Sequence, residues 1–328
     1  NNGREGLFIN IQALSIAIFG HTSFALRIVS ALFGILTVLV ICLFTYEYTR
    51  QRSVALIAGY LLATSFWHVM FSRIGFRAIM APFFLTCGMW LLYMVWNRAG
   101  QTKHSKLLFL AALGGFVFGL GFYSYIAYRI APVLLLPALL LFLREARKNT
   151  SRCILCIPAI YIFFMLLAIV PLALYFGQHH QDFLGRTAQI SIFSSPHPLK
   201  TLLKNAGATI QMFYVVGDFN WRHNIAGNPA LWWPVALFFT IGLFEGIRKK
   251  YALLYMWFFV MLLPVAFSSE GIPHFLRAII MIPPVIIFSA IGLHVTVTLM
   301  VQLFKKAEIK YIEAAIIIRR IQKLIYVL

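Results

Sequence analysis

Residues 24–46 read FALRIVSALFGILTVLVICLFTY, and Arg27 is the one charged side chain among them. An α-helix rises about 1.5 Å per residue, so about 20 predominantly apolar residues cross the hydrocarbon core of a lipid bilayer. The run is therefore long enough and apolar enough to predict a membrane-spanning helix. It decides the fold class, because the same pattern recurs along the chain.

Eight further apolar runs of similar length follow, at residues 53–70, 80–96, 107–123, 126–143, 154–175, 231–247, 251–267 and 276–300. Together these runs predict an all-α polytopic bundle of about nine transmembrane helices. A shorter apolar stretch, residues 7–19, predicts a re-entrant or interfacial helix instead of a full crossing. Residues 301–328 alternate Lys and Arg with Ile and Tyr, which predicts a basic amphipathic helix on the inner leaflet.

The pattern divides the chain into two parts. Residues 1–300 form the membrane bundle, and residues 301–328 form a basic cytoplasmic tail. The bundle has one long outer loop, residues 176–230, and long loops in otherwise tightly connected domains are usually functional.

The composition excludes a soluble globular protein. Of 328 residues, 61% are hydrophobic and 11% are charged, whereas globular domains average about 45–50% apolar and about 25% charged residues. The mean hydropathy is +0.85. The net charge of +19 would suggest nucleic acid in a soluble protein, but the basic residues here lie in short breaks between apolar runs. We therefore expect no nucleic-acid partner and predict an integral membrane protein.

The distribution of basic residues predicts the orientation. Eighteen of the 28 Lys and Arg residues lie in the tail and in the loops near residues 47–52, 97–106, 144–153 and 248–250. Cytoplasmic loops carry an excess of Lys and Arg, so this side is predicted to be cytoplasmic. The other ten lie on the outer side: Arg4, Arg27, Arg73, Arg77, Arg129, Arg186, Lys200, Lys204, Arg222 and Arg277.

The ten outer cations face four outer carboxylates, which are Glu5, Asp182, Asp218 and Glu270. Several of the cations lie at helix ends, where an unpaired charge is costly. Two explanations remain open. The surplus cations either bind the phosphate of a lipid-linked ligand or extend toward the phospholipid headgroups.

Part of the long loop has the residue types of a sugar site. Within residues 218–224, a Trp ring can cover the face of a sugar, polar groups can bind its hydroxyls, and Arg222 can take a phosphate. The alternative is a polar turn that caps the next helix. The candidate sugar or acceptor residues are Asp218, Asn220, Trp221, His223 and Asn224.

No metal or other cofactor is expected. The adjacent His179 and His180 cannot share a helix face, and the sequence contains no HExxH pattern or zinc-ligand spacing. The pattern does not point to a divalent metal. Gly114, Gly115 and Gly119 lie inside an apolar run, which predicts close helix packing instead of a phosphate-binding loop.

Several short motifs resemble a known family. They are FALR, SALFG and LTVL within residues 24–39, Ala63-Thr64-Ser65 and Ser72-Arg73 in the next run, and Arg277 with Pro283-Pro284 and Ile291-Gly292 in the last. The set resembles membrane glycosyltransferases of the GT-C class, in particular the protein O-mannosyltransferases and the aminoarabinose transferases that act on lipid A. The similarity covers most of the membrane bundle.

The resemblance implies a transferase of the bacterial inner (plasma) membrane. Such an enzyme moves a hexosyl or pentosyl group from a polyprenyl-phosphate donor to a lipid, glycan or protein acceptor at the extracytoplasmic face. The family carries a catalytic Asp in its first outer loop, which is expected upstream of Asn1 in an N-terminally truncated sequence. Asp218 is the internal rival for that role.

The family also carries a Glu-Lys-Pro-Pro motif in that loop. Its Lys falls at Arg4, its Glu at Gly3, and its prolines at Glu5 and Gly6. The resemblance therefore makes Arg4 a donor-phosphate residue. Arg277 is a second candidate from its position at the outer end of the last span, and Arg222 is a third.

Other function classes remain open at this level. A polytopic transporter or lipid flippase would show internal symmetry and ionisable residues in mid-helix, and neither pattern is evident. A ligase or polymerase of surface polysaccharide would use the same lipid-linked donors on a similar helical scaffold.

Overall fold

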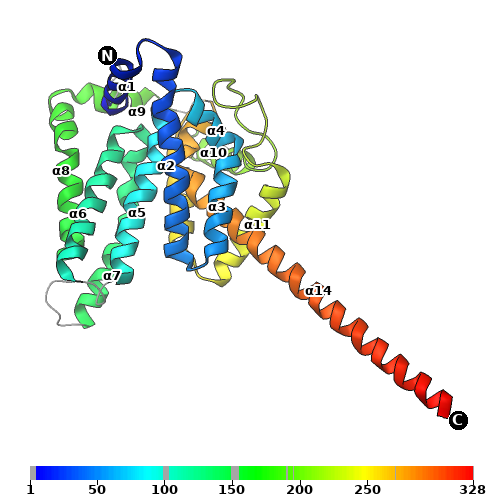
Figure 1. Ribbon diagram of the computed structural model, residues 1–328. Coiled ribbons are helices and arrows are strands. Elements are labelled where there is room, and N and C mark those ends of the chain that lie inside the picture. Colours follow the sequence, from blue (N-terminus) through cyan, green and yellow to red (C-terminus); the bar gives the residue numbers. More distant parts are fainter. Residues whose placement is uncertain are drawn as a thin grey trace.

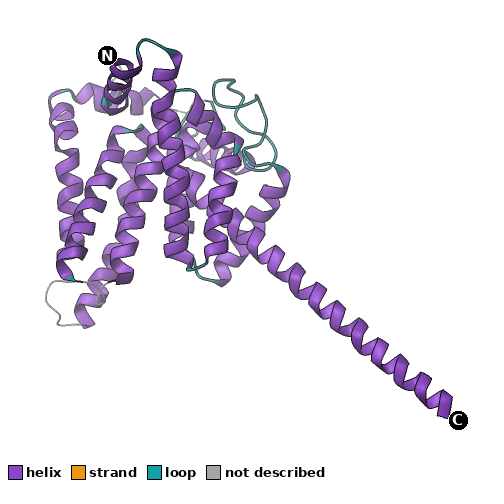
Figure 2. Cartoon of the chain, in the orientation of Figure 1, coloured by secondary structure: helices purple, strands orange, loops and turns teal. Residues whose placement is uncertain are grey.

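The computed structural model describes residues 5–98, 103–148, 155–189, 191–194, 196–269 and 271–327. Within these ranges the regular secondary structure is helical and is joined by loops, with no strand apart from one isolated bridge between Ser191 and Ser268 (Figure 2). The predicted all-α fold class is confirmed.

The α-helices follow the chain in the order shown in Figure 1. They are α1 (Leu7–Phe19), α2 (Ser23–Thr49), α3 (Arg52–Thr64), α4 (Phe66–Arg73), α5 (Met80–Arg98), α6 (His104–Leu120), α7 (Leu135–Lys148), α8 (Cys156–Gln178), α9 (His180–Gln189), α10 (Pro198–Gln211), α11 (Trp233–Arg248), α12 (Ala252–Ala266), α13 (Phe275–Ala278) and α14 (Ile282–Val327). Short 3-10 segments join them: η1 (Arg77–Ile79), η2 (Gly121–Tyr123), η3 (Ile126–Leu134), η4 (Ile192–Ser194) and η5 (Ile279–Met281).

Six helical segments of the described chain are long and apolar enough to cross a membrane, and a seventh span results if the bent pair α3–α4 counts as one. The six are Ser23–Thr49, Arg77–Arg98, His104–Tyr123, Ile126–Arg144, Cys156–Gln178 and Phe275–Ala307. The other two predicted spans are helices as well, α11 and α12. They have 16 and 15 residues, which is short of the about 20 that a straight crossing needs.

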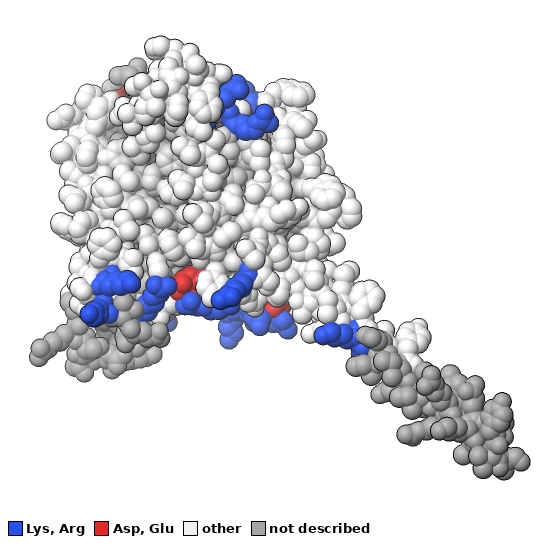
Figure 3. Space-filling model, viewed as in Figure 1, with Lys and Arg blue, Asp and Glu red and all other residues white. Residues whose placement is uncertain are grey.

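The two ends of the bundle differ in charge. The connections from α2 to α3 and from α11 to α12 lie at the lower end in Figure 1. Lys and Arg side chains line this same end in Figure 3, as the predicted clustering of basic loops requires. Helices α1, α4, α9 and α10 lie at the opposite end, which we call the loop end.

Glycines bring pairs of helices into backbone contact. A Cβ at Gly115 of α6 would overlap the carbonyl oxygen of Tyr161 on α8, as expected for a glycine that serves close helix packing. A Cβ at Gly242 of α11 would overlap the carbonyl oxygen of Phe288 on α14. A Cβ at Gly292 of α14 would likewise overlap the carbonyl oxygen of Phe238 on α11. The short helix α11 is thereby fixed along the last span.

The first helix covers the loop end. As predicted, residues 7–19 form a separate 13-residue helix, α1. It is joined to the start of α2 by hydrogen bonds from Ser15 Oγ to the Ala25 carbonyl (2.7 Å) and from Gln12 Nε2 to the Leu26 carbonyl (2.9 Å). At the other terminus, the tail is helical and continues α14, which extends away from the bundle (Figure 1).

Candidate functional site

A cavity of about 650 Å³ lies at the loop end of the bundle. It is enclosed by α1, the turn before α5, the start of η3, α9, the long loop and the segment that leads into α13. Its ionisable and polar lining residues are Arg77, Arg129, Arg222 and Arg277, with Glu5, Gln12, Tyr125, Asp182, Asn220, His223 and His274. Four guanidinium groups thus share the cavity with two carboxylates, which favours an anionic ligand.

Glu5 holds two of the arginines. Its buried carboxylate forms ion pairs with Arg77 and, at 3.7 Å, with Arg129. The Arg129 guanidinium also lies over the ring of Phe183, 4.2 Å from the centroid, and donates a hydrogen bond to the Phe183 carbonyl (3.0 Å). Arg129 is therefore fixed between α9 and the segment before α1.

The other two arginines have their own supports. Arg222 lies over the ring of Phe76, with its guanidinium carbon 5.4 Å from the centroid. Arg277 is buried and donates a hydrogen bond to Ser268 Oγ. Both face the same cavity as Arg77 and Arg129, so four chain segments contribute one cation each.

A second cavity of about 250 Å³ adjoins the first. Its walls are mostly apolar and are formed by Ala127, Ile130, Phe193, Pro264 and Phe267, with Ser191 and Ser268. Ile126, Arg129 and Arg277 line both cavities. We call the first, arginine-lined cavity the polar cavity and the second the apolar cavity. The guanidinium groups of Arg129 and Arg277 therefore lie where the two cavities meet.

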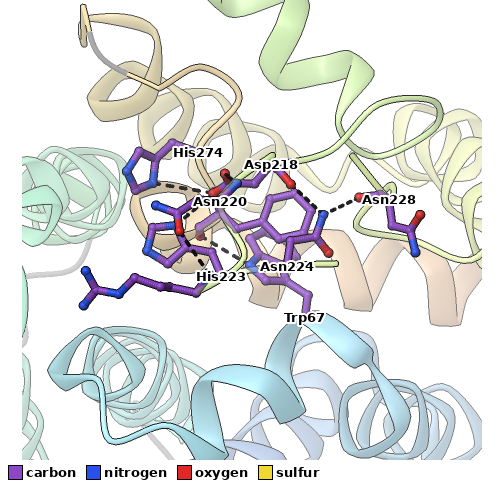
Figure 4. Close-up of polar contacts among 9 residues, drawn as sticks. Trp67, Asp218, Asn220, His223, Asn224, Asn228 and His274 are labelled. Carbon is purple, nitrogen blue, oxygen red and sulfur yellow. Dashed lines mark hydrogen bonds and ion pairs between the residues drawn. The ribbon is translucent and has the colours of Figure 1, made fainter. Parts of the chain in front are cut away.

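The long loop folds around Asp218 (Figure 4). This carboxylate is buried. Its Oδ1 accepts a hydrogen bond from the backbone N–H of Asn220 (2.8 Å). Its Oδ2 accepts one from the backbone N–H of Phe275 (2.9 Å) and lies 3.0 Å from His223 Nδ1. Asn224 Nδ2 donates to the Asp218 carbonyl (3.0 Å). Asp218 thereby joins the long loop to α13.

Electrostatics keep Asp218 ionised. Burial raises the pKa of its carboxyl, but the hydrogen bonds from His223, Asn220 and Phe275 outweigh burial and hold the pKa below its ordinary value. For His274, burial and then the neighbouring charge of Arg277 lower the pKa to about 3. His274 is therefore neutral at physiological pH.

The structure brings together some of the predicted site residues. Arg222, Arg277, Asn220 and His223 line the cavity. Asp218 and Asn224 are buried and are not among its lining residues, and Trp221 is 73% exposed and does not line it either. Arg4 lies outside the described residues.

Four residues of the site were not singled out from the sequence: Glu5, Arg77, Arg129 and His274. The signal for the two arginines was present, because both belong to the ten outer cations. His274 shows its significance only in three dimensions. Asp218, His223 and His274 offer three ligand atoms that all lie within 4.8 Å of one another, so this cluster could hold a metal ion.

The fold is shared with solved membrane enzymes. ArnT from Cupriavidus metallidurans, solved bound to undecaprenyl phosphate, superposes with a TM-score of 0.62 at 15% identity, over 89% of this chain and 50% of that one. The archaeal oligosaccharyltransferase AglB from Archaeoglobus fulgidus, solved with an inhibitory peptide and a dolichol-phosphate, gives a TM-score of 0.56 at 15% identity, over 93% of this chain and 44% of that one. The chain thus spans about half the length of each.

No curated protein matches the chain. The family model "Dolichyl-phosphate-mannose-protein mannosyltransferase" matches residues 3–184, which is more than half of the 328 residues. The resemblance inferred from the sequence motifs is confirmed: the chain belongs to the dolichyl-phosphate-mannose-protein mannosyltransferase family and has the GT-C membrane glycosyltransferase fold.

Proposed function

We propose that this chain is the membrane portion of a glycosyltransferase that moves a sugar from a polyprenyl-phosphate donor to an acceptor hydroxyl. The observation that carries the proposal is the junction of the two cavities. A polyprenyl-phosphate sugar has an apolar chain, a central phosphate and a polar sugar. The apolar cavity, the pair Arg129 and Arg277, and the polar cavity present matching surfaces in the same order.

In the proposed reaction, negative charge develops on the leaving phosphate, beside Arg129 and Arg277. The acceptor oxygen bonds to the anomeric carbon of the sugar while the bond from that carbon to the phosphate oxygen breaks. The electron pair leaves with the phosphate, and the acceptor proton passes to a carboxylate acting as general base. Guanidinium groups fixed before the reaction stabilise the leaving phosphate without having to reorganise.

The polar cavity would hold the sugar and the acceptor hydroxyl. Asn220 and His223 supply hydrogen-bonding groups there, and Arg77 and Arg222 add positive charge. Asp218 has a positioning role in this proposal, because both of its oxygens are engaged by the loop and by α13. The general base remains an Asp in the family's first outer loop, as the resemblance implies.

We place the cavity end on the extracytoplasmic side of a bacterial plasma membrane. The support is the row of Lys and Arg side chains at the opposite end of the bundle, the basic edge (Figure 3), because Lys and Arg accumulate in cytoplasmic loops. A donor whose chain lies in the bilayer would then present its sugar at the outer boundary, where α1, α9 and the long loop lie.

The test compares variants at two arginine positions with a matched control. The full-length protein in nanodiscs is titrated with a polyprenyl phosphate, with the corresponding polyprenol and with inorganic phosphate. Arg129→Gln and Arg277→Gln remove the junction charges, and Arg129→Lys and Arg277→Lys keep them. Arg73→Gln is the control, because Arg73 is an exposed residue at the end of α4 that does not line the cavity.

A charge-assisted hydrogen bond contributes on the order of 1.5–3 kcal/mol, so each Gln variant should bind polyprenyl phosphate at least about tenfold more weakly. The control should bind as the wild type does, and the Lys variants should lie between. Release of sugar from polyprenyl-phosphate mannose should fall in parallel. Equal affinity for polyprenyl phosphate in all five variants would overturn the proposal, as would equal affinity of the wild type for polyprenol.

A further inference from the structure

Three side chains at the wall of the polar cavity form a compact cluster. His223 Nδ1 lies 3.0 Å and His274 Nδ1 lies 3.9 Å from the same carboxylate oxygen, Asp218 Oδ2. Asp218 and His223 are 3% and 4% exposed, and both histidines line the cavity. The two imidazole rings lie side by side, with centroids 4.9 Å apart (Figure 4).

One atom of the cluster is unsatisfied. His274 Nδ1 is buried and has no hydrogen-bond partner among the described residues. The 3.9 Å to Asp218 Oδ2 is too long for a hydrogen bond. Leaving a buried polar atom without a partner is costly, and such an atom in a native protein calls for an explanation such as a bound ion. His274 Nδ1 is the ring nitrogen nearer to the Asp218 carboxylate.

The separations fit a transition-metal ion. Nitrogen and oxygen ligands bind Zn²⁺ at about 2.0–2.2 Å, so two ligand atoms of a tetrahedral ion lie about 3.3 Å apart. The observed 3.0 and 3.9 Å lie on either side of this separation, and all three ligand atoms lie within 4.8 Å of one another. Two imidazoles and one carboxylate suit Zn²⁺, Mn²⁺ or Co²⁺ better than Ca²⁺ or Mg²⁺, which prefer oxygen ligands.

Backbone groups already orient the carboxylate. The Asn220 amide donates to Oδ1 and the Phe275 amide to Oδ2, and outer hydrogen bonds of this kind fix the direction of metal ligands. Arg277 acts in the opposite sense, because its positive charge lies near His274. We therefore expect weaker binding than at a buried structural zinc site.

We propose that Asp218, His223 and His274 form a three-ligand site for a divalent transition-metal ion, with its open coordination position toward the polar cavity. The sequence pattern did not predict a metal, because His274 is remote in sequence from the other two ligands. The inference does not depend on the proposed transferase activity, and its test reads metal binding alone.

The experiment uses the full-length protein in detergent after treatment with a chelator. Titration with Co²⁺ is followed by the visible absorption of the ion, and Zn²⁺ is then added to displace it. Metal content is counted separately by mass spectrometry. The variants Asp218→Asn, His223→Gln and His274→Gln each remove one ligand. His179→Gln is the matched control, because His179 is an exposed histidine at the same end of the bundle.

A fourth variant guards against misfolding. His274→Cys replaces one ligand atom by a thiolate, which is itself a good ligand for Co²⁺ and Zn²⁺. It should retain the bound Co²⁺ and add a sulfur-to-cobalt absorption band in the near ultraviolet that the wild type lacks. His274→Gln is the reference for this band, because it carries the same other cysteines, Cys42 and Cys87 among them, without a thiol at position 274.

The proposal expects one equivalent of Co²⁺ in the wild type and in His179→Gln. It expects at least about tenfold weaker binding in each ligand-removing variant, and the new band in His274→Cys. It is overturned if the wild type binds no more Co²⁺ than His274→Gln does. It is also overturned if His179→Gln alone loses the ion, or if His274→Cys binds Co²⁺ without the new band.

Discussion

Glu5 neutralises part of the positive charge of the cavity and fixes the position of what remains. Its carboxylate is buried between Arg77 and Arg129, both of which keep part of their side chains accessible. A phosphate that enters the cavity therefore meets guanidinium groups already held in place, and less side-chain entropy is lost on binding. Glu5 is a positioning residue in this account and not the general base, because its carboxylate is engaged in ion pairs with Arg77 and Arg129.

Replacing Glu5 by Gln should destabilise the protein, because removing one partner of a buried ion pair leaves charges without compensation, at a cost of about 3–5 kcal/mol. Arg77 and Arg129 are partly exposed, so we expect the lower part of that range. Thermal unfolding of the full-length protein in detergent should show a lower Tm for Glu5→Gln. Polyprenyl phosphate should raise this Tm by less than it raises that of the wild type, because the arginines are no longer held in place before the phosphate binds.

Glu245→Gln serves as the control for this prediction. Glu245 also pairs with an arginine, Arg248, but this partner is 71% exposed and lies at the basic end. Exposed pairs contribute about 0–1 kcal/mol, so this variant should unfold close to the wild type and respond normally to the lipid. A Glu5→Gln variant that melts with the control would show that the carboxylate does not organise the arginines.

The sequence identified the class of residue that forms the site and two of its four arginines, Arg222 and Arg277, but it did not single out Arg77 and Arg129. Arg77, Arg129, Arg222 and Arg277 all belong to the predicted outer surplus of cations. Which four share a cavity depends on the order of helices in the bundle, and no local pattern encodes that order. Glu5 falls at a proline position of the family motif, so nothing in the sequence indicated a buried carboxylate there.

At the scale of helices, the apolar runs predicted where helices lie in the sequence, but they did not predict where a helix bends. The run 53–70 is interrupted by a 56° bend between α3 and α4. Ser65 lies at the bend and is no strong helix breaker. Tertiary contacts hold α4 in place: Trp67 Nε1 donates to the Phe275 carbonyl (3.3 Å), and the two rings pack 5.3 Å apart. The bend therefore brings α4 to the segment that binds Asp218, which sequence periodicity cannot reveal.

Glycine contacts between helices should be intolerant of a single added methyl group. In Gly242→Ala the new Cβ would overlap the backbone of Phe288, so α11 and α14 must separate. Overpacking of this kind costs about 1–3 kcal/mol. Unfolding of the purified protein, followed by tryptophan fluorescence, should occur at a clearly lower temperature in Gly242→Ala than in the wild type.

Gly207→Ala is the matched change for comparison. Gly207 lies inside helix α10, is exposed and has no atom within 4 Å of an added Cβ. Alanine is favoured over glycine in a helix by up to about 1 kcal/mol, so this variant should be as stable as the wild type or slightly more stable. If the two variants had equal Tm values, close packing would not be the reason for a glycine at position 242.

For the whole molecule, the separation of charge gives an orientation. The basic edge lies at one end of the bundle (Figure 3) and the arginine-lined cavity at the other. Cytoplasmic loops attract Lys and Arg, whereas the cavity arginines are partly neutralised by Glu5. In the function proposed above, the two cationic regions have different roles: the basic end acts as a topology signal and the cavity arginines as a ligand site.

This orientation predicts opposite accessibility for two single cysteines. His21→Cys lies between α1 and α2 at the cavity end, and Lys249→Cys lies after α11 at the basic end; both positions are exposed. In intact cells, a membrane-impermeant thiol reagent should label His21→Cys above the wild-type background. It should label Lys249→Cys only after permeabilisation. The reverse pattern would invert the molecule, and equal labelling would reject the topology.

The central claim is that the junction between the polar and the apolar cavity binds a lipid-linked phosphate. The most direct measurement is a cryo-EM structure of the full-length protein in nanodiscs with polyprenyl phosphate. The account predicts phosphate density between Arg129 and Arg277, with the chain in the cavity lined by Ile130, Phe193 and Phe267. Density instead in the cavity of about 390 Å³ at the basic end, lined by residues including Arg248 and Lys249, would contradict it.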